Sequence, residues 1–142
     1  MRPIEVLLVE DSPTDIALTQ EGLKVAEFEN KLNVVEDGAD ALDYLYGRGA
    51  FGDRHLPDLV LLDLNLPKVS GFDVLKHIKG SDQLKQIPVV VLTTSKDDND
   101  ILKAYRELAN CFISKPMDFA KFTTIVRAID TFWFQTVSLP AR

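Results

Sequence analysis

Short apolar runs that alternate with longer, helix-like segments are the feature that most limits how this chain can fold. The runs lie at residues 4–11, 31–37, 58–63, 88–95 and 111–116. All but the second are apolar on both faces, which is typical of parallel strands that helices cover on each side. A strand-then-helix unit therefore repeats five times. The pattern predicts an α/β fold with a five-stranded parallel sheet and helices on both faces.

The segments between the runs carry helix signals. Ser12 followed by Pro13 is typical of a helix start, and apolar residues recur later at helical spacing. The predicted helices cover residues 12–28, 39–49, 71–80, 98–110 and 118–137. No linker-like stretch divides the 142 residues, a length that suits one domain. Residues 1–142 are therefore expected to form a single domain with an extended apolar final helix at about 118–137.

The overall charge argues against several classes of partner. With 22 acidic against 16 basic residues the formal net charge is −6, whereas phosphate backbones and anionic membrane surfaces require clustered Lys and Arg. No apolar run approaches the roughly 20 residues of a membrane span, and the N-terminal segment does not fit a signal peptide. Cys111 is the only cysteine, so no internal disulfide can form. We therefore expect a cytoplasmic protein that binds neither nucleic acid nor membrane.

Reactive side chains follow four of the predicted strands. They are Glu10 and Asp11 after the first, Asp63 after the third, Thr93 after the fourth and Lys115 after the fifth. Open parallel sheets bind ligands beyond the carboxyl ends of their strands, so these groups should meet at one edge. Each alone has an ordinary explanation, such as a turn or helix cap for an acid or a strand preference for threonine. Their joint arrangement favours a functional site.

Three carboxylates at one edge need a cation or partial protonation, because two unit charges about 4 Å apart repel by about 4 kcal/mol at an effective dielectric of roughly 20. All-oxygen ligands favour Mg²⁺, and the absence of Cys and His from the pattern disfavours zinc. A carboxylate beside Mg²⁺ can accept a phosphoryl group as an acyl phosphate. Lys115 could bind one phosphoryl oxygen as a point charge, and Thr93 could donate a hydrogen bond to another.

Four motifs, LLVEDS, PDLVLLDLNLPKVSG, IPVVVLTTS and FISKP, resemble those of receiver domains, the phosphoacceptor modules of two-component response regulators. The resemblance covers essentially the whole chain. It implies a flavodoxin-like receiver fold of five strand-helix units, with Asp63 as the phosphorylated residue. It further implies a Mg²⁺ cofactor bound directly by Asp11 and Asp63, through water by Glu10, and by the backbone carbonyl of Asn65. Such a protein is a signalling switch and not an enzyme with a separate substrate.

The same resemblance assigns roles to three further positions. Thr93 and Phe112 would be switch residues and Lys115 the phosphate-binding lysine, with a cis bond between Lys115 and Pro116. Phosphorylation would change the partner affinity of the face built from the fourth helix, fifth strand and fifth helix. Two positions depart from the common pattern. Phe112 replaces a tyrosine that is often found there, and Thr94 stands where many receivers carry alanine.

The segments LLDLNLPK, GAFGDRHLPD and FWFQTVSLPAR carry a closer resemblance, to the stand-alone response regulators that partner bacterial and cyanobacterial phytochromes. This resemblance implies that the phosphoryl donor is a sensor histidine kinase, and that this kinase is a phytochrome.

The final predicted helix is unusually apolar. On a helical wheel its apolar arc exceeds half the circumference, which is wider than the roughly 100° that a core-facing helix needs. One interpretation is a partner surface, and the other is that the last apolar residues fold back onto their own domain. The regulators it resembles form dimers here, which implies a homodimer through the face of the fourth helix, fifth strand and fifth helix. The expected contact residues are Phe119, Phe122, Ile125, Phe132, Trp133 and Phe134.

Two other functions fit part of the pattern. An aspartate-nucleophile phosphohydrolase would share the parallel sheet and the Asp after a strand. Such enzymes usually need a second Asp two residues on, where this chain has Asn65. A pseudo-receiver would only bind partners, and the intact set of Asp11, Asp63 and Lys115 argues against it.

Overall fold

One parallel sheet runs through the part of the chain that this computed structural model describes, residues 3–26, 29–116 and 118–140. Its strands are β1 (Ile4–Val9), β2 (Asn30–Val35), β3 (Leu59–Leu62), β4 (Val89–Thr93) and β5 (Cys111–Ser114). They lie in the order β2-β1-β3-β4-β5, and every neighbouring pair is parallel. This arrangement confirms the predicted five-stranded parallel sheet.

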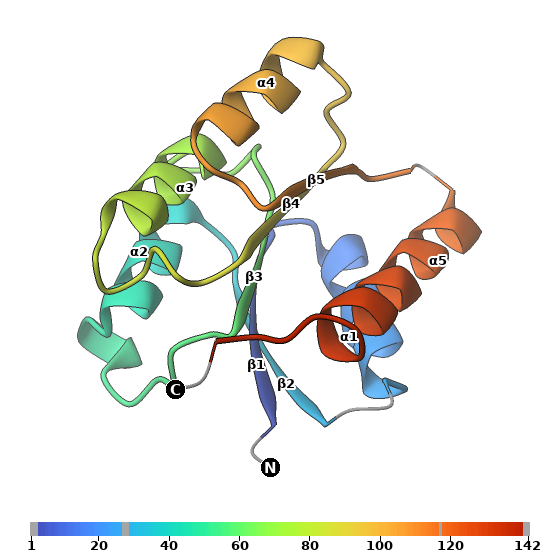
Figure 1. Ribbon diagram of the computed structural model, residues 1–142, viewed down its shortest axis with the longest axis horizontal. Coiled ribbons are helices and arrows are strands. Elements are labelled where there is room, and N and C mark those ends of the chain that lie inside the picture. The colour runs from blue at the N-terminus through green and yellow to red at the C-terminus, as the bar shows by residue number, and fades with distance from the viewer. Residues whose placement is uncertain (1–2, 27–28, 117, 141–142) are drawn as a thin grey trace.

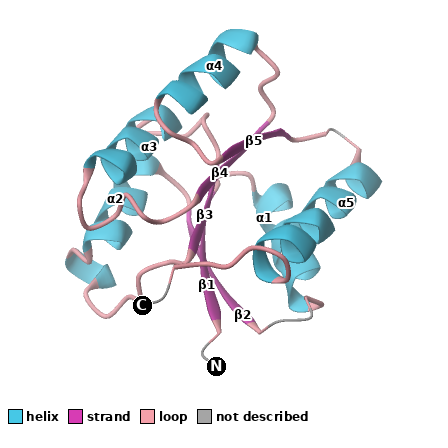
Figure 2. Cartoon of the chain, in the orientation of Figure 1, coloured by secondary structure: helices cyan, strands magenta, loops and turns pink. Residues whose placement is uncertain are grey.

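Helices cover both faces of this sheet (Figure 1). They are α1 (Pro13–Lys24), α2 (Gly38–Tyr46), α3 (Gly71–Gly80), α4 (Asp98–Arg106) and α5 (Phe119–Ile129), with a short 3-10 turn, η1, at Gly49–Phe51. α1 and α5 lie side by side on one face, and α2, α3 and α4 lie on the other (Figure 2). The result is the layered, flavodoxin-like architecture that the sequence predicts.

Two apolar cores separate these layers. Along β1, Leu7 and Val9 belong to the core under α2 and α3, whereas Val6 and Leu8 belong to the core under α1 and α5. All four side chains are buried. Because the side chains of a strand alternate between its faces, two covered faces require a run that is apolar at every position.

The helices begin close to where the sequence places them. Ser12 caps α1, because its hydroxyl accepts a hydrogen bond from the backbone N–H of Asp15 at 3.3 Å. α1 ends at Lys24, and the last residues predicted for this helix, 27–28, lie outside the described part of the structure. α3 occupies its predicted range, whereas α4 ends at Arg106, earlier than predicted.

The final helix is shorter than predicted. α5 ends at Ile129, and a π-helical turn, η2 (Asp130–Phe134), replaces the regular helix expected there. After this turn the backbone N–H of Val137 donates to the carbonyl of Phe132 at 2.8 Å. A π turn spaces bonded groups five residues apart, so these side chains leave the positions that a 3.6-residue helical wheel gives them. No helix in the described ranges is long and apolar enough to cross a membrane.

Three of the residues expected to form the dimer contact are buried within the single chain. Trp133 and Phe134 are only 8% and 6% exposed, and Phe122 on α5 is buried as well. All three belong to the core under α1 and α5. Their assignment to the surface is therefore wrong for the single chain. The alternative interpretation, in which the last apolar residues fold back, holds for Trp133 and Phe134.

The other three expected contacts differ from one another. Phe132 is 53% exposed, and Ile125 is half-buried against the core under α1 and α5. The side chain of Phe119 lies outside the described part of the structure. Phe132 is thus the one described side chain of the six that remains largely at the surface.

Candidate functional site

The carboxyl ends of the strands bring the predicted site residues to one edge of the sheet. Glu10 and Asp11 follow β1, Asp63 follows the neighbouring β3, and Lys115 follows β5. These four residues line one hollow of about 460 Å³. Its other lining residues are Ser12, Thr14, Asp15, Asn65, Thr94 and Pro116. The fold therefore gathers the acids and the lysine as predicted.

The three acids converge closely enough to share a cation. One carboxylate oxygen from each of Glu10, Asp11 and Asp63 lies within 4.8 Å of the others. Glu10 and Asp63 are buried and Asp11 is exposed, so the cluster opens to solvent on one side. Glu10 is held in place because its Oε2 accepts hydrogen bonds from the backbone N–H groups of Asp11 and Ser12, at 3.1 and 3.2 Å. Three carboxylates with an open side fit a hard cation such as Mg²⁺, which keeps several of its waters.

Lys115 supplies the positive charge in the same hollow. Its side chain is only 3% exposed, and its Nζ lies 2.5 Å from Oε1 of Glu10 and 2.8 Å from Oδ2 of Asp15. Oδ2 of Asp63 is farther away, at 3.6 Å. Burial lowers the pKa of Lys115, but the hydrogen bonds to Asp15 and Glu10 outweigh this effect and raise the pKa overall. The ammonium therefore stays charged at neutral pH.

The charge of Glu10 is less secure. The pKa of Glu10 is raised from 4.5 to about 7. Burial is the main cause, the hydrogen bond with Lys115 opposes it, and the nearby charge of Asp63 adds to it. One buried cation is thus not enough for all the acids at this edge. This balance supports the sequence argument that the cluster needs a further cation or must hold a proton.

Thr93 and Phe112, the predicted switch residues, lie beside this edge. Thr93 closes β4, its side chain is fully buried, and its hydroxyl has no hydrogen-bond partner among the described residues. Its backbone carbonyl accepts a hydrogen bond from the N–H of Lys115. Phe112 on β5 is half-buried against the core under α2 and α3, and its N–H donates to the hydroxyl of Tyr105 at 3.2 Å. Neither side chain lines the hollow.

The structure contradicts the expected cis bond before Pro116, whereas the roles expected of Asn65 and Thr94 stay predictions. The bond between Lys115 and Pro116 is trans, since the described part of the chain contains no cis peptide bond, so the expected cis bond is wrong. Trans is the ordinary, slightly lower-energy state of an X–Pro bond, and Lys115 meets its acidic partners from it. Asn65 and Thr94 are exposed at the hollow, and the N–H of Asn65 donates to Oδ1 of Asp63 at 3.3 Å.

Asp15 is a member of this site that the sequence did not reveal. It lies in the first turn of α1, where an acid is already explained by the positive end of the helix. In the structure its side chain reaches Lys115, a hundred positions away in the sequence. The signal that could have found it is its place one turn into the helix that directly follows Glu10 and Asp11.

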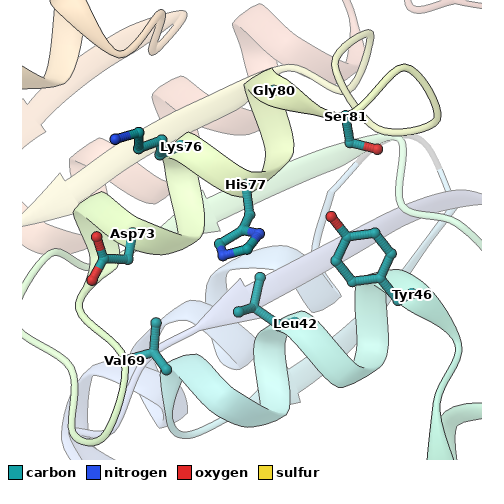
Figure 3. A pocket seen from close by; sticks show the side chains of 8 residues that line it. All are labelled: Leu42, Tyr46, Val69, Asp73, Lys76, His77, Gly80 and Ser81. Atoms are coloured by element: carbon teal, nitrogen blue, oxygen red, sulfur yellow. The ribbon is translucent and has the colours of Figure 1, made fainter.

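A larger hollow, of about 550 Å³, lies between α2 and α3. Figure 3 shows His77 of α3 pointing toward Leu42 and Tyr46 of α2 in this hollow. Its lining includes none of the predicted site residues, and its ionic groups are the single acid Asp73 and Lys76, with His77 beside them. The candidate functional site is therefore the smaller hollow at the strand ends, where three acids and a buried lysine converge.

An open parallel sheet with such a cluster at its carboxyl edge is the arrangement expected of a receiver domain. The sequence profile of the response regulator receiver domain matches residues 6–127, so the chain belongs to this family of signalling proteins.

One response regulator and one related regulatory protein are similar in sequence to nearly the whole chain. Response regulator Rcp1 of Synechocystis sp. is 42% identical over 139 residues, which cover 98% of this chain and 95% of that protein. The probable methanogenesis regulatory protein FilR2 of Methanothrix harundinacea is 42% identical over 131 residues, covering 92% of this chain and 84% of that protein.

Solved structures of response regulators closely match the fold of this chain. The Mn(2+)-bound form of Rcp1 superimposes with a TM-score of 0.96 at 42% identity, covering 98% of this chain and all of that one. The phosphorylated cyanobacterial phytochrome response regulator RcpA gives a TM-score of 0.96 at 41% identity, covering 99% of this chain and all of that one. These matches confirm the predicted similarity to phytochrome-associated response regulators.

Proposed function

We propose that Asp63 accepts a phosphoryl group from the phosphohistidine of a sensor kinase. The observation that carries this proposal is the convergence of Glu10, Asp11 and Asp63 with the buried Lys115. An oxygen of Asp63 attacks phosphorus, the bond from phosphorus to the histidine nitrogen breaks, and the nitrogen keeps the electron pair. Water could later attack the phosphorus of the acyl phosphate in the same site. The bond from phosphorus to the Asp63 oxygen would break, that oxygen would keep the electron pair, and inorganic phosphate would leave, so no separate substrate is turned over.

Mg²⁺ is the cofactor that we propose, and a bound Mg²⁺ would neutralise charge on the transferring phosphoryl oxygens. Asp11 and Asp63 would bind it directly, Glu10 through water, and Asn65 through its backbone carbonyl. The support is the all-oxygen donor set, its open side, and the metal-bound form of the related Rcp1.

The chain's own residues would hold the phosphorylated state. Lys115 would bind one phosphoryl oxygen, since its Nζ already lies 3.6 Å from Oδ2 of Asp63. Thr93 would donate its unpaired hydroxyl to another oxygen, and Phe112 would move with it. The face of α4, β5 and α5 would then change its affinity for partners.

The proposed phosphoryl donor is a phytochrome histidine kinase. The support is the full-length similarity to RcpA, described as a phytochrome response regulator, and to Rcp1. FilR2 has the same identity to this chain as Rcp1, but the match covers less of both chains and comes from a methanogen regulator. A cytoplasmic location and the absence of nucleic-acid and membrane partners stay predictions.

A homodimer through the face of α4, β5 and α5 remains our proposal, with a changed set of contacts. Phe132 is exposed, and so are three apolar side chains on or just after α4, namely Leu102, Tyr105 and Leu108. Exposed apolar groups of this size are typical of interfaces. Phe119 and Ile125 stay in the proposed contact set, whereas the buried Phe122, Trp133 and Phe134 would support it from within.

Phosphoryl transfer to the wild-type protein and to Asp63→Asn tests the proposed function. A radiolabelled histidine kinase, or labelled acetyl phosphate with Mg²⁺, should label the wild type and leave Asp63→Asn unlabelled. Asp73→Asn, which changes an exposed acid on α3, is the matched control and should label normally. Equal labelling of Asp63→Asn would remove Asp63 from the role, and an unlabelled wild type would favour a pseudo-receiver.

A second experiment tests the dimer. Analytical ultracentrifugation of the wild type and of Phe132→Ser should show a dimer that the substitution weakens. Beryllofluoride, a mimic of the phosphoryl group, can be added to the same samples to measure whether the switch and the dimer are coupled. A wild-type monomer at all concentrations would contradict the dimer.

A further inference from the structure

Lys115 has one acidic partner that does not belong to the converging cluster. Its Nζ lies 2.8 Å from Oδ2 of Asp15, clearly closer than the 3.6 Å that separates it from Oδ2 of Asp63. Among the residues that the structure describes, the converging oxygens come from Glu10, Asp11 and Asp63. Asp15 therefore binds the lysine without being placed to bind a cation at the cluster.

The position of Asp15 is fixed by its own backbone contacts. Its N–H donates to the Ser12 hydroxyl at 3.3 Å, and its carbonyl accepts from the hydroxyl of Thr19 at 2.8 Å. Thr19 is buried, so this end of α1 is anchored against the protein. The Asp15 side chain is 22% exposed and lines the same hollow as Asp63 and Lys115. It is thus held at the wall of the hollow, facing the lysine.

The ammonium has a limited number of contacts to give. It carries three N–H donors, and the short contacts to Glu10 and Asp15 engage two of them. A cation at the cluster would draw on Glu10, and the ion pair with Asp15 would remain. The third N–H is available for a phosphoryl oxygen on Asp63, but Nζ lies 3.6 Å from Oδ2 of Asp63, and a shift toward that residue would lengthen the contact with Asp15.

We propose that Asp15 is a positioning residue that competes with the phosphoryl group of Asp63 for Lys115. This inference rests on the proposed function of Asp63. Asp15 holds the lysine in place before phosphorylation and opposes its movement afterwards, and its negative charge also repels the incoming oxygens. The resting state is favoured by this contact, and the phosphorylated state is disfavoured.

Binding of beryllofluoride in saturating Mg²⁺, followed by fluorine NMR, measures this competition. Asp15→Asn removes the charge and keeps the shape, and it should bind the mimic about two- to fivefold more tightly than the wild type, as expected for a partly exposed ion pair. Asp15→Ala should behave like Asp15→Asn, and Asp15→Glu, which keeps the charge, should return toward wild-type affinity. A purely structural role would weaken binding in Asp15→Ala and would not depend on charge.

Glu21→Gln is the matched control, because it removes one exposed acid from the same helix and should leave the affinity unchanged. Unchanged or weaker binding by Asp15→Asn, with a wild type that binds, would overturn the inference alone. A wild type that fails to bind the mimic would overturn the proposed function instead. Thermal unfolding of each variant without the mimic verifies that all are folded.

Discussion

The Nζ of Lys115 lies 2.5 Å from Oε1 of Glu10, although 105 positions separate the two residues in the sequence. This buried contact joins the residue after β5 to the residue after β1, although β3 and β4 lie between these two strands in the sheet, and it provides the acidic edge with its positive charge.

Lys115→Met should therefore destabilise the metal-free protein. It leaves buried acids without a partner, a change that costs about 3 kcal/mol in unfolding free energy. Urea unfolding with a chelator present measures the loss, and added Mg²⁺ should reduce it. Lys85→Met removes a lysine from an exposed pair with Asp82 and should cost less than about 1 kcal/mol. Equal costs for the two variants would contradict the proposed role of the buried contact.

Mg²⁺ affinity should rise with pH because of Glu10. Burial and the nearby charge of Asp63 outweigh the opposing effect of Lys115, so the pKa of Glu10 is about 7, above its ordinary 4.5. The group therefore stabilises the metal-free fold fully below about pH 4.5, and that contribution is lost as the pH rises through about 7. Cation binding should displace the proton, so calorimetric titrations from about pH 6 to pH 8 should show up to a tenfold gain per pH unit below the pKa. Glu10→Gln should flatten this dependence, and a pH-independent wild type would disprove it.

Asp37 should make stability sensitive to acid. The hydrogen bond from the backbone N–H of Asp40, at the start of α2, lowers the pKa of Asp37, and Lys68 lowers it further. This contribution is present above the ordinary pKa of 3.8 and is lost as the pH falls through the lower pKa of the folded state. Asp37→Ala should cost about 1 kcal/mol at neutral pH, and less in acid. Denaturant unfolding at both pH values measures the difference, and an equal cost at both would refute the charge argument.

Two glycines at opposite ends of α3 should respond differently to alanine. A Cβ at Gly71 would lie 2.5 Å from Cα of Leu64 and would also meet the carbonyl of Asp63, whereas a Cβ at Gly80 would meet nothing. Gly71→Ala should lose about 2 kcal/mol or more and displace the segment after Asp63. Gly80→Ala should be neutral or gain up to about 1 kcal/mol. Melting temperatures of the two variants measure this contrast, which would fail if both behaved alike.

The burial of Trp133 predicts a contrast with its neighbour Phe132. Trp133→Ala empties part of the core under α1 and α5 and should cost about 3–5 kcal/mol. Phe132→Ala removes an exposed ring and should cost less than about 1 kcal/mol in the monomer. Chemical unfolding at low protein concentration separates folding from dimerisation. If Trp133→Ala lowered the free energy of unfolding by no more than Phe132→Ala does, Trp133 would be a surface residue after all.

Much of the fold was predictable because parallel strands leave strong local signals. A strand such as β3, covered on both faces, must be apolar throughout, and its last residue places the acid Asp63 at the sheet edge. Helix starts were equally visible, since an unpaired backbone N–H needs a cap such as Ser12. The gathering of Glu10, Asp63 and Lys115 then follows from topology alone.

The rest depended on contacts that no local pattern records. The π turn changes which way Trp133 and Phe134 point, and a helical wheel assumes a regular helix. Asp15 has a sufficient local explanation as a first-turn acid, so its contact with Lys115 gave no additional signal. Whether Phe122 is buried or exposed depends on the helix α1 beside it.

The sealed hydroxyl of Thr93 carries an energetic consequence for the resting protein. A buried hydrogen-bonding group that lacks a partner costs about 1–3 kcal/mol. β4 ends beside the strand that leads to Asp63, so an oxyanion formed there could relieve this unmet bond. Part of the free energy that favours the active conformation would then come from this unmet hydrogen bond in the unmodified fold. Thr93→Val should therefore stabilise the resting state and weaken its response to phosphorylation.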